Sequence, residues 1–286
     1  MVNKIYNKWF ILPLLIIFTA FFIIPTIISF FFSLTVWSLT EFRFVGLLNF
    51  RTFFTEFSLS IGIKNTLFYG FLTSGIKTVL GLLLALFLTG NLKSRNVLRS
   101  IIFFPHIVST IAVGITFTSL MHPTLGLFNS ALAAIGITGP NWLGNPDVAL
   151  FSVICVDVWK GVGVATIIYI AGLNAISQTY YEAASIDGVN SFQKFRFITL
   201  PLVQSSINTV IILSFIGGLR TFDLIWAMTR GGPGFATDTL ASIIYKQYAF
   251  GFYGLSTAGN VLLFILTAVI IFPLYKFLIS KEVEHG

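Results

Sequence analysis

The amino-acid sequence predicts an all-α membrane protein with six transmembrane helices, and three observations support this prediction. Only 9% of the 286 residues are charged, whereas a soluble domain carries roughly 25%. Hydrophobic residues make up 56% of the chain, and the mean hydropathy is +0.92. The apolar residues gather in six stretches that reach the ~20 residues a helix needs to cross a bilayer. So little charge excludes an ordinary soluble enzyme and a disordered protein, and the one cysteine excludes a disulfide scaffold.

The first predicted span covers about residues 9–37 and follows Lys4 and Lys8. Its apolar run continues far beyond the roughly 7–15 residues of a secretory signal core, and no small-residue cleavage site follows. We therefore expect a retained helix. At ~1.5 Å per residue this helix exceeds the bilayer core, which predicts tilt, and Pro13 and Pro25 are expected to bend it.

Five further spans follow in order. They cover about residues 65–90, 98–121, 148–172, 202–222 and 257–279. Segments of ~10 residues that alternate between apolar and polar are absent from the sequence, which excludes an outer-membrane barrel. We expect residues 1–286 to form a single transmembrane domain.

The basic residues predict the orientation, because cytoplasmic loops carry an excess of Lys and Arg. One side holds Lys4, Lys8, Lys93, Arg95, Arg99, Lys194, Arg196, Lys276 and Lys281, and the other holds Arg43, Arg51, Lys64, Arg230 and Lys246. We expect a multi-pass protein of a prokaryotic cytoplasmic membrane with both termini in the cytoplasm. The net charge of +7 is then a topology signal and does not indicate nucleic-acid binding.

The sequence contains no motif for covalent chemistry. It has neither a G-x-x-x-x-G-K-[ST] phosphate loop nor a Cys/His metal cluster. Gly254-Leu255-Ser256 lacks the second glycine of a nucleophile elbow. We therefore expect no catalytic residue, no metal and no cofactor on this chain. A membrane-embedded enzyme is disfavoured, while an independent carrier or channel stays open at this point.

The loop between the fourth and fifth spans differs from the rest of the sequence. Ser177 or Thr179 is suited to cap a short helix with Glu182 in its first turn. Gly188 is suited to end that helix by adopting positive φ, and Pro201 suits the first turn of the fifth span. The alanines after Glu182 predict a small-residue face that a docked partner could approach closely.

The same loop resembles the E-A-A-x-x-x-G-x(9)-I-x-L-P signature of ABC-importer permeases, because every fixed position matches. The matching residues are Glu182, Ala183, Ala184, Gly188, Ile198, Leu200 and Pro201. In that family the loop, here residues 177–200, contains a cytoplasmic coupling helix that seats in a groove of a separate ATPase, and the ATPase holds ATP and Mg. The resemblance implies the type I ABC importer permease fold. It also assigns ATPase coupling to these residues and Asp187, and it disfavours an independent carrier.

Further segments extend the resemblance over about residues 60–286. They are Ala171-Gly172-Leu173, Phe222-Asp223-Leu224-Ile225-Trp226, Thr229-Arg230-Gly231-Gly232-Pro233-Gly234 and Ala249-Phe250. They are similar to the first of the two permeases in maltose-type carbohydrate importers, although Arg230 stands where glycine is common. The resemblance implies an ATP-driven sugar or oligosaccharide importer in which this chain forms half of the pathway. The implied partners are a second homologous permease, two cytoplasmic ATPase subunits and an extracytoplasmic sugar-binding protein.

Two spans carry small and polar residues on one helical face. Spacings of i, i+3, i+4 and i+7 group Asp157, Lys160, Gly161 and Val164 in the fourth span, and Ser214, Gly217, Gly218 and Thr221 in the fifth. The resemblance places a sugar pathway at these positions and adds Val158. Both substrate lining and helix packing through small residues remain open interpretations.

Charges inside the spans are costly and by default mark function. Lys77 is expected either to pair with Asp157 or to face the pathway. Alternatively, Asp157 and Lys160 neutralise each other at i, i+3. Lys160 and Arg220 also raise a second hypothesis, in which the sugar is anionic, such as a uronate or sialate.

Overall fold

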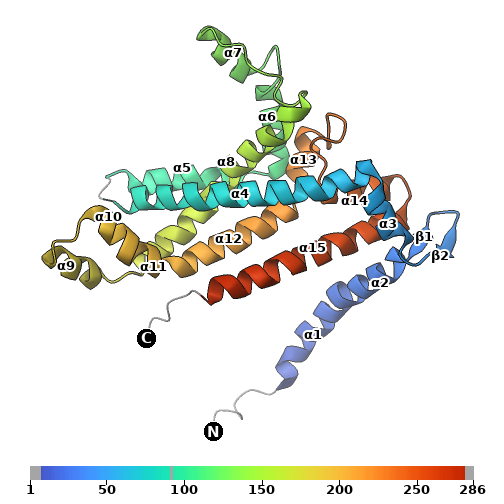
Figure 1. Ribbon diagram of the computed structural model, residues 1–286, viewed down its shortest axis with the longest axis horizontal. Coiled ribbons are helices and arrows are strands. Elements are labelled where there is room, and N and C mark those ends of the chain that lie inside the picture. The colour runs from blue at the N-terminus through green and yellow to red at the C-terminus, as the bar shows by residue number, and fades with distance from the viewer. Residues whose placement is uncertain (1–7, 91–92, 281–286) are drawn as a thin grey trace. The chain divides into compact units, whose positions relative to one another are not determined.

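The computed structural model describes residues 8–90 and 93–280, and helices dominate it (Figure 1). Lys4 and Lys281, two residues on which the predicted orientation depends, lie outside the described residues. The chain divides into two compact units. One comprises the described residues up to Ser60 together with Ile243–Ile265. The other comprises Ile61–Ser242 together with the described residues from Leu266 onward.

Within residues 8–90 and 93–280, four helices are long and apolar enough to cross a membrane. They are Trp9–Ser33, Phe57–Thr89 (α4), Pro146–Asn174 (α8) and Tyr253–Ile279 (α15). Two bent pairs pass the same test together: Arg95–Ile107 (α5) with Thr110–Leu120 (α6), and Ser191–Leu202 with Gln204–Leu219 (α12). The number of spans reaches six if each bent pair crosses once.

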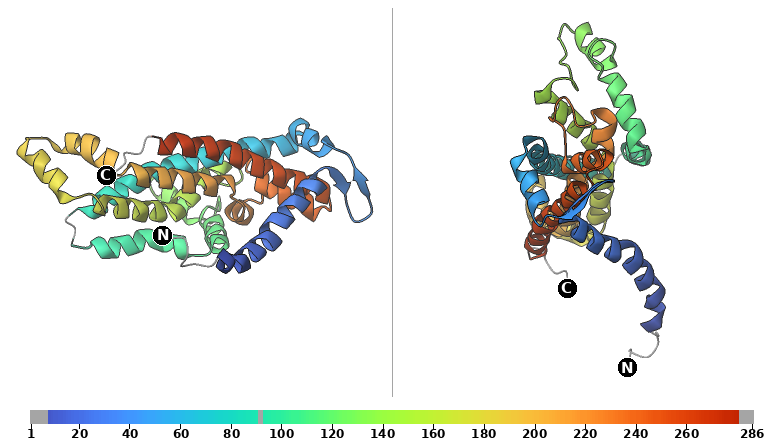
Figure 2. Two further views of the ribbon diagram at one scale, coloured as in Figure 1. Left: turned by 90° about the horizontal axis from the view of Figure 1, so that it is seen from below. Right: turned by 90° about the vertical axis from the view of Figure 1, so that its right-hand side faces the viewer.

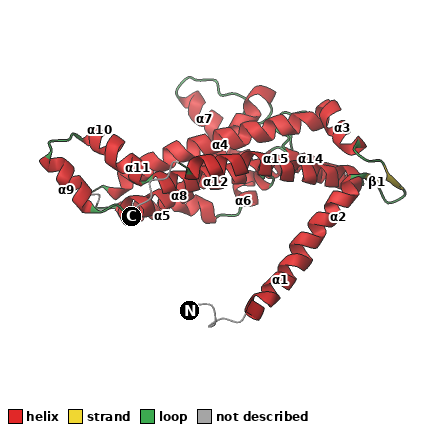
Figure 3. Cartoon of the chain, turned by 60° about the horizontal axis from the view of Figure 1, so that its bottom comes forward, coloured by secondary structure: helices red, strands yellow, loops and turns green. Residues whose placement is uncertain are grey.

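Shorter elements make up the Trp9–Ser33 and Ser191–Leu202 helices or connect the long helices. They are η1 (Lys8–Ile11), α1 (Leu12–Phe18), η2 (Thr19–Ile23), α2 (Ile24–Ser33), β1 (Thr35–Trp37), β2 (Phe42–Phe44), α3 (Leu48–Thr55), α7 (Leu127–Ala134), α9 (Gln178–Ile186), α10 (Ser191–Lys194), η3 (Phe195–Thr199), α11 (Leu200–Leu202), α13 (Asp223–Met228) and α14 (Leu240–Ala249). Figure 3 shows how the loops connect these helices.

The first helix ends at Ser33, before the end of the predicted span 9–37. Residues Thr35–Trp37 form β1, which pairs antiparallel with β2. β-Branched and aromatic side chains favour this extended conformation, and the Trp37 ring stacks on Phe32 at 4.2 Å. The amide of Asn49 fixes the helix end by donating to the Ser33 and Thr35 carbonyls at 2.9 and 2.7 Å.

Pro25 has the local effect that its chemistry predicts. It lacks an N–H, and its ring would clash with the carbonyl four residues earlier in a regular helix. The helix relieves this clash with a π-helical turn, η2, directly before α2. Pro13 lies in the first turn of α1, where a proline is tolerated.

The second unit contains α4, α5, α8 and α12, which lie side by side (Figures 1 and 2). Small residues allow close contact between them. A Cβ on Gly81 of α4 would lie 2.7 Å from the Cβ of Ala165 in α8, and one on Gly218 of α12 would lie 2.8 Å from the Cα of Gly70 in α4. Such contacts are typical of helix packing in membranes.

The third predicted span, 98–121, is wrong as one straight helix. The backbone becomes extended at Val108 and Ser109, and α6 departs from α5 at 96°. α5 packs on α8, whereas α6 packs on α13. The two helix-disrupting residues of this segment, Pro105 inside α5 and Gly114 inside α6, both lie away from the break itself.

The other predicted spans differ from the helices mainly at their ends. The span 148–172 lies inside α8, and 257–279 begins four residues after α15 does. α4 begins at Phe57, before the predicted start at residue 65. Its first turns include the polar residues Ser58, Ser60 and Lys64. Polar residues are tolerated there because this part of the helix extends past the apolar layer of the membrane.

Candidate functional site

The loop between α8 and α12 folds into short helices at one end of α4, α5, α8 and α12 (Figures 1 and 2). α9 begins at Gln178 because Ser177 caps it, accepting a hydrogen bond from the Thr179 N–H at 3.4 Å. The predicted cap is present. The prediction that Glu182 lies in the first turn is wrong. Residues 178–181 form the first turn, and Glu182 begins the second.

Gly188 ends α9 as its sequence position predicts. It adopts φ +73°, a conformation that costs glycine little. The Gly188 N–H donates to the Ser185 carbonyl at 3.2 Å, and the Val189 N–H donates to the Ala184 carbonyl at 3.0 Å. These two bonds form a Schellman motif.

A second helical piece leads back to α12. Asn190 and Gln193 form a capping box at the start of α10. The piece continues through η3 and α11 and then bends by 65° before α12 begins at Gln204. Pro201 therefore lies in the first turn of α11, before the bend, and not at the start of α12.

Hydrogen bonds hold the two pieces of the loop together. The Tyr181 hydroxyl lies 3.0 Å from the Thr199 hydroxyl, and the Lys194 ammonium donates to the Ser185 hydroxyl at 2.6 Å. The loop therefore presents one defined surface.

The predicted coupling residues are not equally accessible. Glu182, Ala183, Asp187 and Gly188 are exposed, Ile198, Leu200 and Pro201 are half-buried, and Ala184 is buried. The predicted face of two alanines is thus reduced to Ala183. The predicted coupling residues did not include Ile186, which is 88% exposed, or Phe192 and Phe197, which are 74% and 72% exposed. Three exposed apolar side chains on one small loop are a signal for a docked partner.

A pocket of about 150 Å³ lies among α4, α5, α8 and α12. Its lining residues are Lys77, His106, Gly161, Val164, Ala165, Ile168, Val210, Leu213, Ser214 and Gly217. Four predicted pathway residues, Gly161, Val164, Ser214 and Gly217, therefore meet at one pocket. His106 was not among the predicted residues.

An ion pair adjoins the pocket. The Lys77 ammonium lies 2.7 Å from the Asp157 carboxylate, and their side chains are 10% and 22% exposed. This is one of the two predicted roles of Lys77. Among the described residues no ion pair joins Asp157 to Lys160. The Lys160 ammonium instead donates to the His106 carbonyl at 3.3 Å.

Gly161 makes room for the Lys77 side chain. A Cβ at this position would lie 2.7 Å from Cε and 2.8 Å from Nζ of Lys77. Because the neighbour is the flexible end of a lysine, an added methyl group would displace the ammonium from Asp157.

The other predicted pathway residues do not line the pocket. Gly218 contacts Gly70 and Thr73, which assigns it to helix packing. Val158 is buried in one apolar cluster with Tyr69, and the Thr221 carbonyl accepts a hydrogen bond from the Thr239 hydroxyl. Arg220 is exposed at the end of α12.

Tyr69 is a buried residue that the sequence analysis missed. Its side chain is fully buried, and its hydroxyl lies beside Asp157 and Thr221. An aromatic residue in an apolar span carries no signal that would separate it from the other packing residues.

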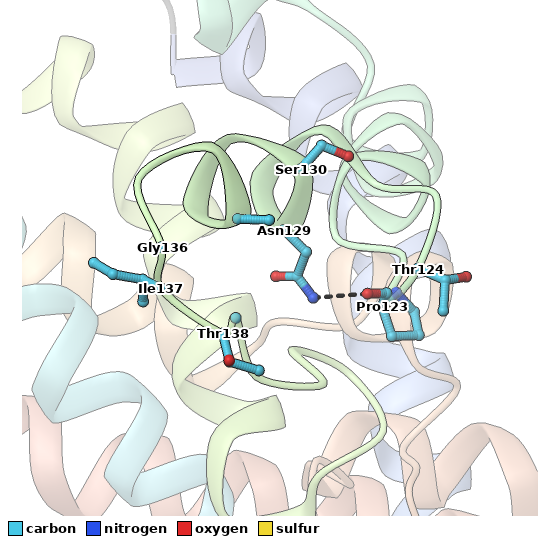
Figure 4. Close-up of a pocket in the computed structure, with 9 residues that line it drawn as sticks. Pro123, Thr124, Asn129, Ser130, Gly136, Ile137 and Thr138 are labelled. Carbon is cyan, nitrogen blue, oxygen red and sulfur yellow. Dashed lines mark hydrogen bonds between the residues drawn. The ribbon is translucent and has the colours of Figure 1, made fainter.

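A larger pocket of about 500 Å³ lies in the loop 122–145, around α7 (Figure 4). The Asn129 amide donates to the carbonyls of Pro123 and Pro140 at 2.9 and 3.1 Å, and its oxygen accepts from the Trp142 indole at 2.7 Å. None of the nine lining residues is charged. The loop is thus a folded, uncharged structure.

Comparisons with known proteins identify relatives of this chain. The family described as "binding-protein-dependent transport system inner membrane component" matches residues 77–282. The trehalose/maltose transport system permease protein of Thermococcus litoralis is 39% identical over 90% of this chain and 88% of its own length. The multiple sugar-binding transport system permease protein of Streptococcus mutans is 33% identical over 99% of both chains.

A solved structure has the same fold. It is a bacterial ABC transporter involved in the import of the acidic polysaccharide alginate, and one of its chains superimposes with a TM-score of 0.82. The match covers 95% of this chain and 94% of that chain at 24% sequence identity. At this identity the likeness shows the fold alone.

The two glycines of α12 yield a prediction about packing. Gly218→Ala should lower the free energy of unfolding by about 1–3 kcal/mol, because its Cβ would collide with the Gly70 backbone. Gly217→Ala is the matched control, since nothing lies within 4 Å of its Cβ. Both changes carry the same gain in helix propensity. Thermal unfolding in detergent micelles measures the difference, and equal midpoints would contradict the packing role of Gly218.

The ion pair yields a second prediction. Lys77→Met should lower the free energy of unfolding by about 3 kcal/mol, because it leaves Asp157 unpaired at membrane depth. The double variant Lys77→Met/Asp157→Asn should lose less free energy of unfolding than the sum of the losses in Lys77→Met and Asp157→Asn. Lys64→Met, at an exposed position of the same helix, is the control and should have no effect. Unfolding midpoints in SDS measure all four variants, and additive losses would show that the pair contributes nothing.

Proposed function

The chain belongs to the family of binding-protein-dependent transport system inner membrane components, and from this premise we propose that it is the permease subunit of an ATP-driven sugar or oligosaccharide importer. Its fold is that of a type I ABC importer permease. The observation that carries the proposal is the loop after α8, which combines the E-A-A…G pattern with an exposed, apolar surface. The names of the relatives in Thermococcus and Streptococcus support a sugar as the substrate.

In this proposal each bent helix pair crosses the membrane once, so that six spans place both termini on the same side. The excess of basic residues supports the cytoplasm of a prokaryote as that side. The loop 177–200 then lies in the cytoplasm, whereas the loops around α7 and between α13 and α15 lie outside. An extracytoplasmic sugar-binding protein would dock on these outer loops.

The loop 177–200 transmits force from a cytoplasmic ATPase. Glu182, Ala183, Asp187 and Gly188 would face the ATPase groove together with Ile186, which is 88% exposed. Two ATPase subunits would serve the complex and hold ATP and Mg. The permease itself would catalyse no reaction and bind no cofactor.

The pocket among α4, α5, α8 and α12 forms one wall of the sugar pathway. Pockets that enclose a ligand usually measure ~300–1,000 Å³, whereas this one measures about 150 Å³. A second homologous permease would complete the enclosure. Closure of the ATPase dimer would turn the pathway outward, and hydrolysis would reset it inward.

A neutral sugar fits the pocket better than an anionic one. The charge of Lys77 is balanced by Asp157, and the Lys160 ammonium is occupied at the end of α5. Arg220 lies outside the lining. The structure therefore gives little support to the anionic-sugar hypothesis. Inhibition of uptake by acidic but not by neutral oligosaccharides would support it.

The coupling loop yields a prediction that separates the importer from an independent carrier. Gly188→Asp should abolish copurification of the ATPase and ATP-dependent uptake, because it places a side chain and a negative charge on the exposed end of α9 and strains the left-handed backbone there. Gly251→Asp is the matched control, since Gly251 has φ +84° with nothing within 4 Å but lies outside this loop. It should retain the ATPase. If no ATPase copurifies with the wild type and Gly188→Asp leaves uptake intact, the importer assignment fails.

A further inference from the structure

His106 enters the pocket from the end of α5. It is the next-to-last residue of this helix, which ends at Ile107 where the backbone becomes extended. The 96° turn into α6 follows directly. His106 lines the pocket with Lys77 on α4, Gly161 on α8, and Ser214 and Gly217 on α12.

The histidine ring has no structural task at this helix end. A histidine in the last turn of a helix commonly stabilises the free carbonyls. Here the Lys160 ammonium takes that role, donating to the His106 carbonyl at 3.3 Å. Within residues 8–90 and 93–280 the imidazole nitrogens form no hydrogen bond, and the ring makes a tilted contact with Phe103 at 5.8 Å. Its polar groups are free to bind a ligand.

The pocket has few other free polar groups. The Lys77 ammonium already donates to Asp157, and an ammonium offers no acceptor. The Ser214 hydroxyl forms no hydrogen bond in the part of the chain that the structure describes and can also donate and accept, so Ser214 and His106 are the two side chains of the lining suited to bind a sugar hydroxyl. A sugar hydroxyl both donates and accepts, and so needs partners of both kinds. A neutral imidazole supplies one donor and one acceptor in a single ring.

We propose that His106 is a sugar-binding residue, hydrogen-bonded to one hydroxyl of the transported sugar, and that it contributes to substrate selection. This assignment rests on the proposed function, in which sugar passes this pocket.

The test is uptake into proteoliposomes that contain the complete transporter. The binding protein is placed on the side of the membrane from which the sugar is imported. The probes are maltose, trehalose, raffinose and arabinotriose, followed by the monodeoxy derivatives of whichever of these the wild type accumulates. Losing the hydroxyl that His106 binds should slow wild-type uptake about fivefold relative to the parent sugar. In His106→Ala the same derivative and its parent should be taken up at about equal rates, while the ratios for all other derivatives stay unchanged.

Two further variants separate binding from folding. His106→Gln keeps a donor and an acceptor, and it should restore part of the discrimination. Phe104→Ala changes a 64% exposed residue of the same helix that does not line the pocket, and it should keep every wild-type ratio. The amount of ATPase that copurifies reports assembly for each variant.

The outcomes are distinct. If His106→Ala and His106→Gln keep all wild-type ratios, His106 does not bind the sugar and the assignment is overturned. If the assembled wild-type transporter accumulates none of the four sugars, and none of a wider panel of neutral and acidic mono- and oligosaccharides, sugar import itself is refuted, and the proposed role of His106 is refuted with it.

Discussion

The ion pair between Lys77 and Asp157 is the interaction on which the pocket depends. A charge at membrane depth is tolerated only when it is paired, so α4 and α8 must stay close enough for the 2.7 Å contact. Gly161 lies one turn after Asp157, and the absence of its side chain lets the lysine pass over the α8 surface. One turn further, Gly81 of α4 contacts Ala165 of α8. Charge pairing and small residues thus act together to set the distance between two walls of the pocket.

The fifth span shows why substrate lining and helix packing are hard to separate in a sequence. Gly217 and Gly218 are neighbours and differ by about 100° around the helix axis. Gly217 faces the pocket with Ser214, whereas Gly218 contacts Gly70 of α4. A spacing of i, i+3, i+4 and i+7 groups both functions in one stripe. Only the position of the neighbouring helix divides the stripe, and that position is set by residues far away in the sequence.

The features that the sequence predicts well are local ones. The Ser177 cap, the positive φ of Gly188 and the limits of α8 depend on residues within one or two turns. The break at Val108 and Ser109 could not be predicted, because neither residue is a strong helix breaker. It follows from α5 packing on α8 while α6 packs on α13. His106 gains its place in the pocket from the packing of α5 on α8, and for this reason the sequence did not single it out.

The same two helices border the pocket and the coupling loop. α8 ends at Asn174, about 20 Å along the helix from Gly161, and α12 begins at Gln204, about 15 Å from Ser214. Gly172 near the end of α8 would place a Cβ 2.9 Å from that of Ser206, so the helices are in close contact beside the loop. If the loop receives force from an ATPase, as proposed, that force would act on both helices at once and move the pocket walls that carry Gly161 and Ser214. The walls on α4 and α5, which carry Lys77 and His106, are not continuous with the loop. The Lys77–Asp157 pair and the bond from Lys160 to the His106 carbonyl tie these two walls to α8, so all four walls would move together, as rigid-body alternating access requires.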